Sequence, residues 1–136
     1  MIAKLLTAIV LSVLLASCAH DRPFEPSVPF GGQVTLAPGE TASVEGAPVR
    51  VTFLRVSGDS RCPAGVYCIL GGDALVHIRI EDGATGAEYE LHTGDSSRAA
   101  ASHAGVRVAL LKLEPYPFSS RTIGADEYRA TLEISR

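Results

Sequence analysis

From Gln33 onward, hydrophobic and polar residues alternate in short runs that Gly, Pro and Asp interrupt about every eight to fifteen residues. A period of two is typical of strands with one buried and one solvated face, and no run keeps a helical period for ten residues. The pattern therefore predicts an all-β fold, an antiparallel β-sandwich of immunoglobulin-like type with about seven strands. A small barrel would give nearly the same pattern. The predicted strands cover residues 33–37, 41–46, 49–56, 74–81, 86–92, 105–114 and 126–135.

Segments 74–81 and 86–92 are predicted to form a hairpin with its turn at residues 82–85. The register places Ile78 opposite Tyr89 on the buried face and Arg79 opposite Glu88 on the solvated face. A shift by one residue would bury Glu88, so the polarity of the paired positions selects this register.

Two pairs of adjacent apolar residues break the alternation, Phe53-Leu54 and Leu110-Leu111. Such pairs indicate central strands or β-bulges, in which one extra residue turns towards the other face. An apolar strip for binding is the functional alternative.

The first seventeen residues are apolar or small, with one lysine near the start. Their apolar run would span about 18 Å as a helix, which is too short for a hydrocarbon core of about 30 Å and is typical of a signal peptide. The sequence Leu15-Ala16-Ser17-Cys18 resembles the lipobox of bacterial lipoproteins. This resemblance implies cleavage before Cys18 and acylation of that cysteine, with palmitate among the acyl chains.

Several acyl chains would make a stable membrane anchor at Cys18. Ala19 follows where related lipoproteins carry Asp for retention in the inner membrane, so we expect the outer membrane, with the domain facing the periplasm. Residues 18–30 contain three prolines and no apolar periodicity, which predicts an extended tether. The sandwich domain is expected at residues 31–136.

Cys62 and Cys68 remain after Cys18 is assigned to lipid, and a pair of cysteines in an exported chain indicates a disulfide. The loop that they close has seven residues, for which chain entropy gives about 2.4 kcal/mol of stabilisation. A redox role is the alternative, but redox centres favour Cys-x-x-Cys spacing.

The residues around these cysteines, Asp59-Ser60-Arg61-Cys62-Pro63 followed by Val66, Cys68, Ile69 and Gly72, resemble a group of small bacterial exported lipoproteins of unassigned function. Further similarity at residues 74–80, 113–117 and 126–134 extends the resemblance over most of the chain from Gln33. It implies a β-sandwich with one loop disulfide and supplies no activity. Leu70 departs from the pattern, because similar sequences usually have Trp there.

Two polar residues precede the first loop cysteine. The carboxylate of Asp59 can accept backbone N–H groups two or three residues on, and Arg61 can pair with Asp59 or with carbonyl groups at a strand end. Contact of Asp59 and Arg61 with a ligand or partner is the functional alternative.

Apolar and aromatic residues gather in two segments outside the predicted strands. These residues are Tyr67, Ile69, Leu70, Tyr116 and Phe118. If both loops lie at one end of the sandwich, Tyr67 and Tyr116 belong to a surface that faces a partner. The alternative is that they plug the open end of the core.

Few residues of the sequence point to catalytic or metal-binding chemistry. No Gly-x-Ser-x-Gly elbow is present, so we do not expect an enzyme, and no cofactor is implied. In the predicted hairpin, His77 opposes Glu90 and is diagonal to His92, which makes these three residues weak candidates for a metal site. Two histidines and a glutamate on a solvated sheet face are the more ordinary interpretation.

Composition limits the class of partner. Twelve Lys and Arg stand against fifteen Asp and Glu, a net charge of -3, which argues against nucleic acid as a partner. We therefore expect a lipid-anchored, non-enzymatic binding or envelope-accessory module, with an envelope protein as a possible partner. The alternatives are a protease-inhibitor-like domain that presents the disulfide-pinned loop, and a metal-binding envelope protein.

Overall fold

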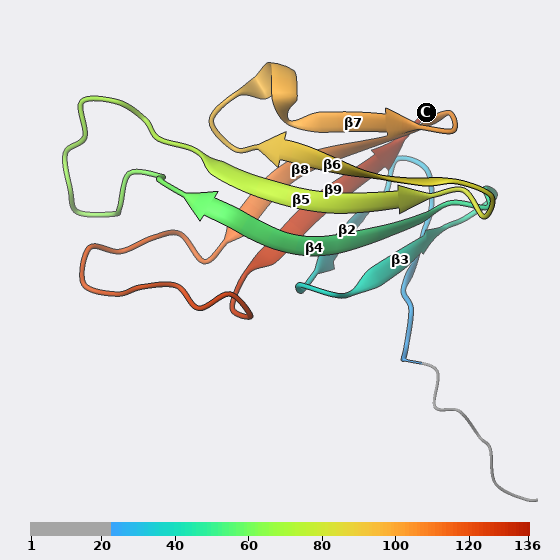
Figure 1. Ribbon diagram of the computed structural model, residues 1–136, viewed down its shortest axis with the longest axis horizontal. Coiled ribbons are helices and arrows are strands. Elements are labelled where there is room, and N and C mark those ends of the chain that lie inside the picture. Colours follow the sequence, from blue (N-terminus) through green and yellow to red (C-terminus); the bar gives the residue numbers. More distant parts are fainter. Residues whose placement is uncertain (1–22) are drawn as a thin grey trace, which may run out of the picture.

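The computed structural model describes residues 23–136 and shows two β-sheets packed face to face (Figure 1). The strands are β1 (Ser27–Val28), β2 (Gln33–Leu36), β3 (Thr41–Val44), β4 (Arg50–Asp59), β5 (Ala74–Glu81), β6 (Gly86–His92), β7 (Ala100–His103), β8 (Val106–Glu114) and β9 (Arg129–Ser135). A short 3-10 turn, η2 (Ser96–Arg98), precedes β7. The predicted all-β sandwich is confirmed, with nine strands between residues 23 and 136 in place of about seven.

The first sheet has the order β1-β3-β4-β5-β6 and the second has the order β2-β9-β8-β7. All pairs are antiparallel except β1 with β3. Strands β3 to β6 follow one another along the chain and in the sheet. No helix in the part of the chain that the structure describes is long and apolar enough to cross a membrane.

The core lies between the two sheets and is formed by alternate residues of each strand. Phe53, Ile78 and Leu132 are among its fully buried side chains. On β9 the buried positions are Ala130, Leu132 and Ile134, and Tyr128 just before the strand is also buried. The alternation in the sequence therefore identifies the core-facing side of this strand.

The predicted hairpin register is confirmed in β5 and β6, where Ile78 pairs with Tyr89 and Arg79 with Glu88. The carboxylate of Asp82 accepts the N–H groups of residues 84 and 85 and shapes the turn.

Both apolar pairs mark irregular positions in central strands. The register of β4 shifts between Phe53 and Arg55, and that of β8 shifts between Leu110 and Lys112. Leu54 and Leu111 are thus the extra residues. The predicted bulges are confirmed, and because β4 and β8 belong to different sheets, the two leucines do not form a common apolar strip.

The tether prediction is wrong for its last residues. Ser27 and Val28 pair with β3, and Val28 is only 2% exposed. The carboxylate of Glu25 also forms an ion pair with Arg50 at the start of β4. Packed chain therefore begins before residue 31, while the predicted signal peptide (1–17) and Cys18 lie outside the described residues.

Candidate functional site

Two long loops lie together at one end of the sandwich, on the left in Figure 1. One connects β4 to β5 and carries the two loop cysteines, and the other connects β8 to β9. The N–H group of Ala64 donates to the carbonyl of Pro117 at 2.9 Å, and Ala64 also forms a parallel bridge with Phe118. The expectation that both loops lie at one end is therefore confirmed.

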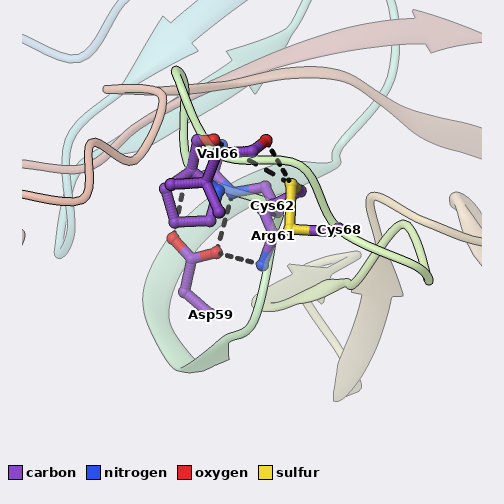
Figure 2. Close-up of a disulfide and its surroundings, with 6 residues drawn as sticks. Asp59, Arg61, Cys62, Val66 and Cys68 are labelled. Carbon is purple, nitrogen blue, oxygen red and sulfur yellow. Dashed lines mark hydrogen bonds and ion pairs between the residues drawn. A yellow bond between two sulfur atoms is a disulfide. The ribbon is translucent and has the colours of Figure 1, made fainter.

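Cys62 and Cys68 form a disulfide with Cα atoms 6.0 Å apart (Figure 2). The predicted pairing is thus confirmed. The bond closes the outer part of the first loop, where the chain has little regular structure of its own. Neither sulfur is a free thiol in this structure.

Asp59 and Arg61 form a buried ion pair where β4 enters the first loop (Figure 2). The Asp59 carboxylate accepts from Nη2 of Arg61 at 2.6 Å and from Nε at 2.8 Å. It also accepts the backbone N–H of Arg61 at 3.2 Å, which is the predicted Asx turn. Two parallel charge-assisted bonds of this kind are strong and fix the guanidinium plane.

The same guanidinium reaches the second loop. Nη1 of Arg61 donates to the carbonyl of Leu113 at 2.8 Å, and Nη2 donates to that of Pro115 at 3.0 Å. The ring of Tyr116 lies over the guanidinium, with its centroid 5.6 Å from Cζ. Since Arg61 is only 9% exposed, it joins the two loops and offers little surface to a partner.

Tyr128 completes this network and was not predicted to do so. The alternation in the last strand identifies its ring as buried, and the structure shows in addition that its hydroxyl donates to Asp59 at 3.1 Å. Burial alone would raise the pKa of Asp59, but the bonds from Arg61 and Tyr128 outweigh it and hold that pKa below its ordinary value. Burial next to this carboxylate raises the pKa of Tyr128.

Beyond the disulfide, the first loop carries large apolar side chains in solvent. We call residues 66–72 the tip. Tyr67 and Ile69 are each 95% exposed and Leu70 is 82% exposed. The interpretation that these residues plug the core is therefore wrong. No charged residue occurs from Cys62 to Gly72.

The backbone of the tip is also unpaired. Within residues 23–136, none of the N–H groups from Tyr67 to Gly72 donates to a protein acceptor. The next donor along the chain, Asp73, binds the hydroxyl of Ser60 and closes the loop base. The tip thus offers both apolar side chains and free main-chain donors.

A small apolar cleft of about 260 Å³ lies in the second loop, lined by Pro115, Tyr116, Phe118, Arg121 and Ile123. Tyr116 and Phe118 are about half-exposed. Arg121 is paired with Glu127, so the cleft has no unbalanced charge from this pair. Tip and cleft together make the largest accumulation of exposed apolar side chains in the described chain.

The three metal candidates are neighbours, as their register requires. Glu90 lies between the histidines, 3.0 Å from Nε2 of His92 and 3.5 Å from Nε2 of His77. The ring of His92 also bonds Asp73 through Nδ1 at 2.5 Å, and His77 bonds Glu88 and Ser57.

These bonds use the ring nitrogens that a metal ion would need. His92 lies between two carboxylates, with Nδ1 bonded to Asp73 and Nε2 to Glu90, so both ring nitrogens already have partners within the protein. Within residues 23–136, no group of three or more His, Cys, Asp and Glu side chains is arranged to hold a metal ion. The geometry thus favours a hydrogen-bonded network on the outer sheet face.

Comparison of the chain with protein-family models, with curated protein sequences and with solved structures finds no match.

Proposed function

We propose that the protein is a lipid-anchored, non-enzymatic binding module that presents the tip to a protein partner in the cell envelope. The observation that carries this proposal is the exposure of Tyr67, Ile69 and Leu70 on a loop closed by a disulfide. Exposed apolar clusters of this kind are rare on monomeric domains unless they bind something.

The construction of the loop base supports the proposal. The disulfide and Arg61 together attach the first loop to β4 and to the second loop. A loop held in one conformation loses less entropy when it binds, so the same contacts give a tighter complex. Large apolar and aromatic side chains are also the usual centres of protein interfaces.

The direction of the tip fits an anchored protein. The described chain enters the sandwich beside Arg50, at the start of β4, whereas the tip lies beyond Asp59 at the end of this strand (Figure 1). A lipid at Cys18 would therefore hold the protein by the end remote from the tip. The lipobox resemblance supports this anchor, and Ala19 after the cysteine supports the periplasm-facing outer-membrane location.

The anchor has its own test. Cys18→Ser should move the protein from the membrane fraction of the cell to the soluble fraction, because several acyl chains are needed for stable attachment. A membrane fraction that does not change would contradict the lipid anchor but would leave the binding role of the tip open.

The binding role is tested by photocrosslinking in cells that express the full chain. A crosslinkable residue at position 67 or 116 should capture the same protein, since Ala64, just before the tip, forms a bridge with Phe118 in the wall of the cleft. The same residue at Ala84, which is exposed in the turn at the opposite end, is the control. Equal capture from all three positions, or no capture from 67 and 116, would contradict the proposal.

A further inference from the structure

The tip offers a partner unpaired main-chain N–H groups as well as side chains. Its N–H groups from Tyr67 to Gly72 find no acceptor within residues 23–136. Main-chain groups of this kind are bound by partners that add a segment of another chain to one of their own strands. Such partners also have pockets for individual side chains. Endopeptidases bind polypeptides in this way, and a primary pocket then selects one side chain.

Tyr67 is the side chain best placed for such a pocket. It is 95% exposed, and it precedes Cys68 directly, so it projects from a position that the disulfide holds. Neither the tip nor the preceding part of the loop back to Cys62 contains Lys or Arg. The pocket that fits is therefore apolar and lacks a carboxylate.

The covalent ring that the disulfide closes explains how a cleaved loop would stay in place. The peptide bond between Tyr67 and Cys68 lies inside the ring that the Cys62–Cys68 disulfide closes. Hydrolysis adds OH from water to the carbonyl carbon of Tyr67 and H to the nitrogen of Cys68. Both new ends remain joined through the disulfide, and loss of water restores the bond. Held ends of this kind re-form a bond far more readily than free ends.

A lipid bilayer fits the tip less well. Unpaired backbone N–H groups are costly in hydrocarbon, where no water can satisfy them. The protein also carries a net charge of -3, which anionic lipids repel. A protein cleft, in contrast, supplies acceptors for the same N–H groups.

Resting on the proposed function, we infer that the partner is an endopeptidase with an apolar primary pocket, which the tip blocks by inserting Tyr67. The full chain, purified in mild detergent with its disulfide intact, is tested against chymotrypsin, whose pocket is hydrophobic, and trypsin, whose pocket carries a carboxylate. It should inhibit chymotrypsin and leave trypsin active.

Substitutions at one position make the test specific. Tyr67→Asp should weaken inhibition of chymotrypsin by at least about 30-fold, the effect of losing a central interface side chain. Tyr67→Arg should transfer inhibition from chymotrypsin to trypsin. Leu111→Arg places a new arginine at a half-exposed site outside the tip and should not inhibit trypsin.

Several results would overturn the inference. These are no inhibition of chymotrypsin by the wild type, no gain against trypsin in Tyr67→Arg, and rapid cleavage of the loop with full recovery of protease activity. Binding to phosphatidylglycerol vesicles or self-association that Tyr67→Asp abolishes would instead identify a bilayer or a second copy as the occupant. Crosslinking from position 67 to a protein that is not a peptidase would refute the endopeptidase and leave the binding role standing.

Discussion

Gly72 passes the carbonyl oxygen of Ser60 so closely that a β-carbon on Gly72 would lie 1.8 Å from that oxygen. This approach closes the base of the disulfide loop, where Ser60 and Asp73 bond each other through backbone and side chain. Gly72 also has a φ of 66°, in the left-handed region that disfavours other residues.

We therefore expect Gly72→Ala to destabilise the protein by about 2–4 kcal/mol, the sum of steric overlap and an unfavourable φ. Urea unfolding of the two variants Gly72→Ala and Gly71→Ala measures the effect. Gly71 is the matched control, because a β-carbon there meets nothing within 4 Å. Similar stabilities for both variants would show that the loop base adjusts freely.

Removing the guanidinium of Arg61 should have a large effect on stability. Arg61→Ala leaves the Asp59 carboxylate without its ion pair and removes the guanidinium donor from two carbonyl groups, so we expect a loss of about 3–5 kcal/mol. Arg98→Ala removes an exposed ion pair to Glu90 and should cost less than about 1 kcal/mol. Chemical denaturation of both variants gives the comparison, and a wild-type stability for Arg61→Ala would rule out its joining role.

Stability should fall in acid, in part through Asp59. Because its pKa is lowered in the folded protein, this carboxylate contributes stability above its unfolded pKa and loses that contribution as the pH falls through the folded value. Below about pH 4 the wild type should therefore lose more stability than Asp59→Asn. Thermal unfolding from pH 6 to pH 2.5 measures the difference, and parallel curves for both proteins would contradict the prediction.

Loss of the disulfide should affect binding more than folding. Replacing both cysteines, Cys62→Ser and Cys68→Ser, removes a constraint worth about 2.4 kcal/mol in the chain-entropy model and leaves the two sheets intact. The double variant should stay folded by circular dichroism but lose crosslinking from position 67. Full crosslinking without the disulfide would show that Arg61 alone holds the tip.

The parts of the fold that the sequence predicts are those in which polarity alternates. β5 and β6 follow their predicted bounds and register because a shift would bury Glu88 or expose Ile78. β1 and β7 could not be predicted from alternating polarity. β1 has only two residues, and β7 consists of Ala100-Ala101-Ser102-His103, which contains no alternation of large apolar and polar side chains.

The loop end could be predicted only in its local contacts. The Asx turn from Asp59 to Arg61 spans two residues and follows from the residue types. The bonds from Arg61 to the second loop end on backbone carbonyls, which every residue has and no sequence pattern marks. The bond between Tyr128 and Asp59 joins residues 69 positions apart, and only the packing of the two sheets brings them together.

If the chain is anchored at Cys18 as we propose, the ion pair between Glu25 and Arg50 would also limit how far the protein can extend from the membrane. Six residues separate Cys18 from Glu25, so this stretch reaches at most about 25 Å. The ten residues of β4 add about 30 Å between the entry point and the base of the disulfide loop. On a lipidated, upright molecule the base of this loop would then move within a layer whose upper boundary is roughly 55 Å above the lipid headgroups, and the tip would project from it. A partner would have to meet the tip next to that layer, and inserting residues between Cys18 and Glu25 would raise its upper boundary.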